Sequence, residues 1–273
     1  MDRVKRYERV TAILHILSVN PNQLLPLSQF CDMFTAAKST LSEDIDILKN
    51  IVGSYGFGHV ETIGGASGGV RFVPYVRKTD AYNYINRLSE SLSGKSRVLP
   101  GGFLYLSDIL ANPKIIAKMG DIIAGEYSTN RPDFVLTMET TGIPVATMTA
   151  NALGTPLVVA RKTGKVYEGS AVSITYLSSG INGVENMSLP RRAVKEGQKA
   201  LIVDDFLKGG NTAKGMVDLM SEFNASVVGL AFIIATTEPV KKSIEKVKPL
   251  MMMAITEEEN PSAIVTPAPW LVG

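Results

Sequence analysis

Residues 200–212 read Ala-Leu-Ile-Val-Asp-Asp-Phe-Leu-Lys-Gly-Gly-Asn-Thr, an apolar run followed by two acidic residues and a glycine-containing loop. The apolar part predicts a buried strand with Asp204 and Asp205 at its carboxyl end, where open α/β sheets bind ligands. The loop 208–212 leads into a predicted helix, and backbone N–H groups at such a helix start favour a phosphate. Because carboxylates repel a phosphate, they are expected to face sugar hydroxyls or a bridging Mg²⁺. The stretch therefore indicates a ribose 5-phosphate site; the alternative is a glycine-rich turn with an exposed acidic pair.

The segments around this stretch alternate between predicted strands and helices. The strands are continuously apolar, which is typical of a parallel sheet with both faces covered. We therefore expect an α/β fold with a mainly parallel sheet. Its strands are predicted at 133–138, 156–160, 199–203, 227–235 and 251–253, and its helices at 144–153 and 212–223.

The first 76 residues follow a different pattern. Three short helices are predicted, and the third has apolar residues at three- and four-residue steps from Leu41 to Val52. Ser39 or Thr40 is expected to cap this third helix. A hairpin with a glycine-rich tip at 64–69 follows. Two helices joined by a tight turn and followed by a hairpin form the layout of a winged helix-turn-helix.

The chain is long enough for one or two domains, and the change of pattern places a boundary near residue 76. We predict a DNA-binding domain at 1–76 and an effector-binding domain at 77–273. The second domain is expected to begin with a connecting helix within 77–98.

Basic and small polar side chains of the first domain are the candidates for DNA contact. They lie in an arm expected to include Arg9, at the start of the third helix, and in the wing, where they meet phosphates and base edges. The predicted contacts are Arg3, Lys5, Arg6, Lys38, Ser39, Thr40, Ser42, Ser67 and Arg71. Acidic residues of the third helix, Glu43, Asp44 and Asp46, are expected to oppose phosphates. A helical cap on the second domain, or a dimerisation element, is the alternative.

Composition excludes several other classes of protein. The 273 residues carry 28 Lys or Arg against 26 Asp or Glu, and the mean hydropathy of +0.13 argues against a disordered chain. The apolar run 227–235 is too short to cross a bilayer, so no membrane partner is expected. One Cys and two His make an internal disulfide impossible and argue against a zinc site. Without a secretory signal, a cytoplasmic protein is predicted.

The stretch 200–212 resembles the phosphoribosyl pyrophosphate (PRPP) motif of type I phosphoribosyltransferases. Its Asp-Asp-Phe-Leu variant is most similar to xanthine phosphoribosyltransferases and to the purine operon repressors of Gram-positive bacteria. Three further segments resemble the pyrophosphate loop, the basic pair and the flexible loop of this family: 139–144, Arg161-Lys162 and 163–188. The repressors also have a winged helix-turn-helix in front, with matching pieces at 37–39, 42–44, 68–70 and 99–102.

The resemblance implies a repressor of purine-synthesis genes that binds double-stranded operator DNA as a homodimer and is released by PRPP. Mg²⁺ would arrive with the ligand, and guanosine tetraphosphate would compete for the same pocket. PRPP would be held by Asp204, Asp205, Phe206, Lys208, Gly209, Gly210, Asn211, Thr212, Thr140, Thr141, Gly142, Arg161 and Lys162. A base would lie near Phe103 or Tyr105. No catalytic residue and no metal held by the protein alone are expected.

Lys208 favours a sensor over an enzyme. Related transferases have an acidic or a small residue at this loop position, whereas a lysine ammonium group cannot accept a proton from a purine ring. Asn211 stands where the family loop has a glycine, and it is expected to tolerate a left-handed backbone. The alternative function is a xanthine-like phosphoribosyltransferase with an accessory N-terminal domain.

Overall fold

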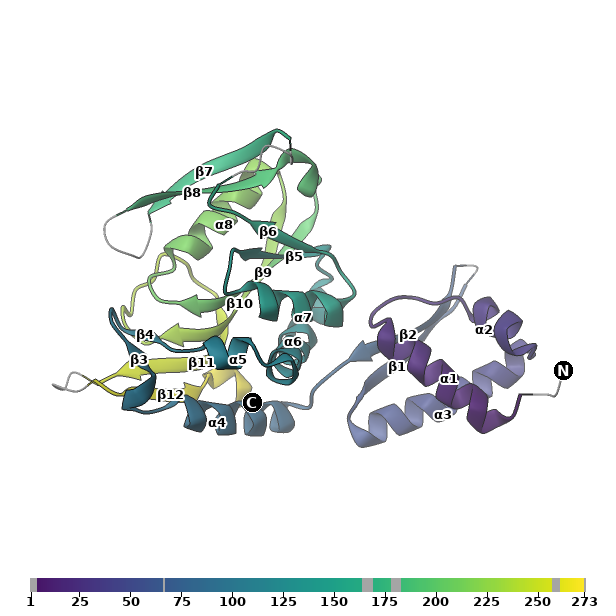
Figure 1. The fold of residues 1–273 in the computed structure, drawn as a ribbon. Coiled ribbons are helices and arrows are strands. Elements are labelled where there is room, and N and C mark those ends of the chain that lie inside the picture. The colour runs from purple at the N-terminus through teal and green to yellow at the C-terminus, as the bar shows by residue number, and fades with distance from the viewer. Residues whose placement is uncertain (1–3, 66, 164–168, 178–182, 257–260, 273) are drawn as a thin grey trace. The chain divides into compact units, whose positions relative to one another are not determined.

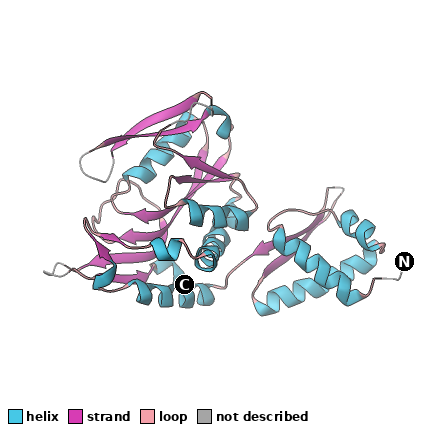
Figure 2. Ribbon diagram, viewed as in Figure 1, coloured by secondary structure: helices cyan, strands magenta, loops and turns pink. Residues whose placement is uncertain are grey.

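The computed structural model describes residues 4–65, 67–163, 169–177, 183–256 and 261–272, drawn in Figures 1 and 2. The chain forms two compact units. Unit 1 comprises Met1–Arg77 with Asn151–Gly154, and unit 2 comprises Lys78–Ala150 with Thr155–Gly273.

Unit 1 is a winged helix-turn-helix, as predicted. Its elements are α1 (Arg6–Val19), α2 (Leu27–Phe34), α3 (Lys38–Tyr55), β1 (Gly58–Ile63) and β2 (Gly69–Pro74). The two strands pair antiparallel and form the wing. The predicted apolar face of α3 is confirmed, since Leu41, Ile45, Leu48 and Val52 are all buried and pack with Phe30 of α2.

Two details at the starts of these helices differ from the predictions. Helix α3 begins at Lys38 after Ala37, and no side chain caps it, because Ser39 and Thr40 already lie inside its first turn. The predicted arm is shorter than expected, since α1 begins at Arg6. Arg6 and Arg9 are therefore residues of a helix rather than of an extended arm.

Unit 2 is an α/β unit built on a six-stranded sheet. Its helices are α4 (Lys78–Leu92), α5 (Ser107–Leu110), α6 (Pro113–Tyr127), α7 (Ile143–Leu153) and α8 (Asn211–Glu222). The sheet strands are β5 (Phe134–Met138), β6 (Leu157–Ala160), β9 (Lys199–Leu207), β10 (Ser226–Thr236), β11 (Lys248–Ile255) and β12 (Ala263–Pro267). Two small hairpins complete it: β3 (Val98–Leu99) with β4 (Phe103–Leu104), and β7 (Ala171–Leu177) with β8 (Val184–Pro190).

The sheet has the order β12-β11-β10-β9-β5-β6 and is parallel except for the pair β11–β12. The mainly parallel sheet is thus confirmed. Strand β5 is followed by β6 on one side, whereas β9 is followed by β10 on the other. The carboxyl ends of β5 and β9 therefore flank a topological switch point, the place where open α/β sheets bind ligands.

Helices cover both faces of this sheet. Met216, Leu219 and Met220 of α8 pack with Leu136 and Ile202 on one face. On the other face, a Cβ at Gly229 would point into the ring of Tyr127 on α6. Side chains alternate between faces along a strand, so Val135 and Leu201, which are also fully buried, belong to the α6 side.

Two further features of unit 2 concern its margins. The segment 163–188, expected as a flexible loop, contains the β7–β8 hairpin in its described part, and Figure 1 shows this hairpin beside α8. At the far edge of the sheet, β12 is held against the end of α4: the amide of Val265 donates to Ser93 Oγ at 3.0 Å, and Gly94 pairs with Ala263.

Among the described helices, none has the length and apolar character needed to cross a membrane.

Candidate functional site

Two adjacent carboxylates lie near the end of β9, at the switch point. The strand is longer than predicted, because its pairing with β10 continues to Leu207, so Asp204 and Asp205 are strand residues. Asp204 is buried, and Thr137 of β5 donates a hydrogen bond to its Oδ1 at 3.3 Å. A Cβ at Gly142 would lie 1.8 Å from the same oxygen, so only glycine leaves room for this carboxylate.

The environment of the pair controls its charge. Burial raises the pKa of the Asp204 carboxyl, and repulsion from Asp205 raises it further. Burial also raises the pKa of Asp205, while a hydrogen bond from the Thr141 side chain acts in the opposite direction. The vicinal hydroxyls of a sugar can donate hydrogen bonds to carboxylate oxygens placed in this way.

The loop after β9 turns the chain sharply into α8. Gly210 has a left-handed backbone, with φ of +85°, and immediately precedes the helix. Asn211, expected to tolerate such a conformation, does not need to adopt it: it is the first residue of α8, and its Oδ1 accepts a hydrogen bond from Ser243 Oγ. The side chain of Thr212 follows in the first turn. A helix of twelve residues with its free N–H groups at this point is suited to an anion.

Lys208 is held by the neighbouring β3–β4 hairpin. Its Nζ donates to the carbonyl oxygen of Gly101 at 2.6 Å and lies 5.3 Å from the centre of the Phe103 ring. The Phe103 ring packs on Phe206, with ring centres 5.6 Å apart. Of the two predicted base contacts, Phe103 lines the hollows on both of its sides, whereas Tyr105 lines only the smaller one, of about 120 Å³, which Asp205 and Phe206 also line.

The predicted basic pair is already paired with acidic residues. Arg161 Nη1 lies 3.7 Å from Glu139 Oε2, and the backbone N–H of Lys162 donates to Glu139 Oε1. Lys162 Nζ lies 2.9 Å from Glu185 Oε2 on β8, and Tyr176 of β7 donates to the same oxygen at 2.9 Å. Burial and Glu185 together raise the pKa of Tyr176 to about 12.

These groups surround one cavity of about 420 Å³, a volume typical of small-molecule sites. Eight predicted ligand residues and one predicted base contact line it: Asp204, Asp205, Phe206, Lys208, Gly210, Thr212, Thr141, Lys162 and Phe103. Five predicted residues lie outside the lining, namely Thr140, Gly142, Arg161, Gly209 and Asn211. Sequence reasoning missed Tyr176 and Glu185, because both sit on a hairpin expected to be a loop.

The described part of the chain contains no cluster of three or more His, Cys, Asp or Glu placed to hold a metal ion. Mg²⁺ usually binds proteins through one or two carboxylates together with substrate phosphates. Asp204 and Asp205 therefore fit a Mg²⁺ ion that a phosphorylated ligand brings with it.

Comparisons with known proteins agree with both units. The family model "Bacterial purine repressor, N-terminal" matches residues 5–74, and the model "Phosphoribosyl transferase domain" matches residues 106–266. The purine biosynthesis transcriptional repressor PurR of Bacillus subtilis is 36% identical over 92% of this chain and 88% of its own length. The chain belongs to the PurR family of purine biosynthesis regulators. The PurR transcriptional activator of Lactococcus lactis subsp. lactis is 41% identical over 85% of each chain.

The likeness extends beyond the PurR family. A xanthine phosphoribosyltransferase of Geobacillus thermodenitrificans is 32% identical over 55% of this chain and 79% of its own length. Within the PurR family, this fold therefore occurs in regulators, and outside it in enzymes.

The predicted DNA contacts of this PurR-family chain are distributed over unit 1. Lys38 is the first residue of α3, Ser39 and Thr40 lie in the same first turn, and Ser42 follows at the start of the next. Arg71 is paired with Glu61 across the wing at 2.7 Å, and Ser67 is exposed at the wing tip. Arg3 lies outside the described residues.

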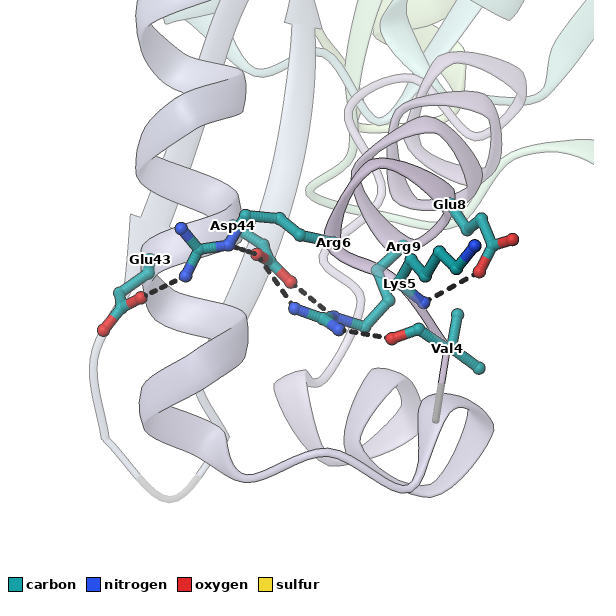
Figure 3. A network of polar contacts seen from close by, with 7 residues as sticks. All are labelled: Val4, Lys5, Arg6, Glu8, Arg9, Glu43 and Asp44. Atoms are coloured by element: carbon teal, nitrogen blue, oxygen red, sulfur yellow. Dashed lines mark hydrogen bonds and ion pairs between the residues drawn. The ribbon is translucent and has the colours of Figure 1, made fainter. Parts of the chain in front are cut away.

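The acidic residues of α3 do not act as a group. Asp44, expected to oppose phosphates, is fully buried and pairs with Arg9 at 2.7 Å, so its charge is neutralised inside the unit. Glu43 is exposed and pairs with Arg6 at 2.6 Å, and Asp46 pairs with Lys49 at 3.0 Å. Figure 3 shows how Arg6 and Arg9 converge on Asp44.

Proposed function

We propose that this protein represses purine-synthesis genes by binding operator DNA through unit 1, and that PRPP releases it. The observation that carries the proposal is that one chain joins a winged helix-turn-helix of the purine repressor family to a cavity lined by two adjacent carboxylates and the first turn of α8. The similar B. subtilis and L. lactis proteins are named as a repressor and an activator. A transcription assay must therefore test whether this chain lowers or raises expression of its target genes.

The cavity offers a partner for each part of PRPP. Asp204 and Asp205 face the ribose hydroxyls, and the loop from Lys208 to Thr212 with the start of α8 meets the 5-phosphate. Lys162 and Arg161 meet the pyrophosphate beside Thr140 and Thr141. In the free protein Glu139 and Glu185 hold these two cations, so the pyrophosphate must compete with them. A Mg²⁺ ion bound to PRPP reduces the repulsion between its phosphates and the carboxylates of Asp204, Asp205, Glu139 and Glu185.

The site lacks a group that could deprotonate a purine base at the position of Lys208. An ammonium group has no acceptor, and this one is already directed at the Gly101 carbonyl. We therefore propose a sensor rather than a transferase. Guanosine tetraphosphate is proposed as a competing ligand of the same cavity, and a homodimer as the DNA-binding form.

The test is fluorescence anisotropy of a labelled duplex from a purine-operon control region, titrated with the protein at fixed salt. We expect tight binding that Mg²⁺-PRPP weakens, and an Asp205→Ala variant that binds DNA but ignores PRPP. Binding that PRPP never affects would refute the sensor. Absence of specific DNA binding would refute the regulator, and transfer of the phosphoribosyl group from PRPP to xanthine, with release of pyrophosphate, would then establish the enzyme.

A further inference from the structure

In the cluster of Figure 3, two arginines, Arg6 and Arg9, lie at the single buried carboxylate of Asp44. Asp44 has no exposed surface, and Arg9 meets both of its oxygens, with Nε–Oδ2 at 2.7 Å and Nη2–Oδ1 at 3.3 Å. Arg9 is itself nearly buried, so these two charges satisfy each other. Arg6 approaches the same carboxylate through Nε at 3.3 Å, which leaves its positive charge in excess.

Glu43 takes up that excess charge at the surface. Its Oε2 lies 2.6 Å from Arg6 Nη2, and both side chains are more than half exposed, at 65% and 55%. The contact differs from the buried pair in this respect: Glu43 can move into water without leaving a buried charge. Asp44 cannot, because its departure would strand Arg9.

These contacts fix the position of Arg6 relative to α3, the helix that carries predicted DNA contacts. Glu43 follows Ser39 and Thr40 by one turn on α3, a rise of about 5.4 Å, so all three share a face. Arg9 also donates from Nη1 to the carbonyl oxygen of Val4 at 2.7 Å, which ties the residues before α1 to the same cluster. The guanidinium of Arg6 therefore lies about one turn along α3 from Ser39 and Thr40, two of the predicted DNA contacts.

We propose that Glu43 holds Arg6 where it meets a DNA phosphate, and that the phosphate replaces Glu43 when DNA binds. A guanidinium group offers the same forked pair of donors to a carboxylate and to a phosphate, so one can replace the other. Asp44 and Arg9 act as positioning residues that keep Arg6 in place during the exchange. This inference rests on the proposed function of unit 1 as a DNA-binding module.

The consequence is that Glu43 weakens binding to every duplex by competing for Arg6. Exposed ion pairs contribute about 0.2–1 kcal/mol. Glu43→Gln, which removes the competing charge and keeps the shape, should therefore tighten DNA binding by up to about fivefold. Asp46→Asn is the matched control: it removes one charge from an exposed ion pair on the same helix, with Lys49 rather than Arg6 as the partner.

The experiment measures anisotropy of a labelled purine-operon duplex at several salt concentrations, with circular dichroism to verify folding of each variant. We expect Glu43→Gln to tighten DNA binding more than Asp46→Asn does. When Arg6→Gln is added to both the wild type and the Glu43→Gln variant, the two proteins should bind the duplex equally tightly. Equal effects of the two charge removals, or a gain that persists without Arg6, would overturn the inference while leaving DNA binding intact. A wild-type protein that binds no duplex would overturn the proposed function and this inference together.

Discussion

Replacing Gly142 by alanine gives the sharpest test of the ligand site. Gly142 does not have a positive φ, so alanine would normally stabilise the fold by about 0.4–1 kcal/mol through the unfolded chain. Here its Cβ would fall 1.8 Å from Asp204 Oδ1 and 2.5 Å from Thr137 Oγ1, and overpacking of this kind costs about 1–3 kcal/mol. The net expectation is a loss of about 1–2 kcal/mol, or roughly 2–8 °C in melting temperature.

The same overlap displaces Asp204 from its place beside Thr137. If one hydrogen bond between this carboxylate and the ribose is lost, at about 1.5–3 kcal/mol, PRPP should bind about 10- to 150-fold more weakly. Calorimetric titration with Mg²⁺-PRPP measures the affinity, and fluorescence of Trp270, the one tryptophan in the sequence, reports the melting of unit 2. Gly53→Ala, with open space around the new methyl group, is the control. Unchanged affinity and melting in Gly142→Ala would refute the geometry argued for Asp204.

Four further predictions follow from named contacts. Asp204→Asn should be more stable than the wild type at pH 7: a pKa raised by burial favours the protonated form in the fold, and that stability is lost as pH rises through the folded-state pKa. Urea unfolding at pH 7 and near pH 4 should show the advantage shrinking at low pH, and a constant difference would contradict it. Asp44→Ala leaves the buried charge of Arg9 without its carboxylate and should cost unit 1 about 3–5 kcal/mol by circular dichroism, whereas a loss similar to that of exposed Asp46→Ala would show the pair to be unimportant. Lys38→Ala should lower the slope of log affinity against log salt by about one, and an unchanged slope would remove this phosphate contact. Lys208→Ala should show no transfer of the phosphoribosyl group from PRPP to xanthine, hypoxanthine or guanine in a spectrophotometric assay; any nucleotide product would mean that the lysine alone blocks catalysis.

Much of the fold could be predicted because it depends on local pattern. The apolar runs at β5, β6, β9 and β10 had their type and place correctly predicted, as did the helical face of α3. The β7–β8 hairpin was missed because most of β7 is exposed or half-buried and β8 is buried only from Met187 to Leu189, so the segment read as a polar loop. The end of β9 was placed too early, because the acidic pair looked like the start of a loop.

The candidate site was predictable only where it is continuous in sequence. The run from Asp204 to Thr212 supplies most of the predicted residues that line the cavity. Glu185 joins the cavity through the fold of a distant hairpin, and no local signal marks it. The same holds for Asp44, whose partner Arg9 is 35 residues away. From the sequence of α3 alone this carboxylate looks exposed, and only the packing of α1 shows that it is buried.

The bond between Ser93 and β12 has a consequence for how the chain leaves the ribosome. The two partners, Ser93 Oγ and the amide of Val265, are 172 residues apart, and β12 packs against α4. Chains grow at about 5–20 residues per second, so the apolar face of α4 waits roughly 10–30 s for its covering strand. Unit 1 is mostly made of residues that precede α4 and can fold during that interval. During synthesis unit 1, apart from residues 151–154, is therefore ready before unit 2, while the apolar face of α4 still lacks its covering strand.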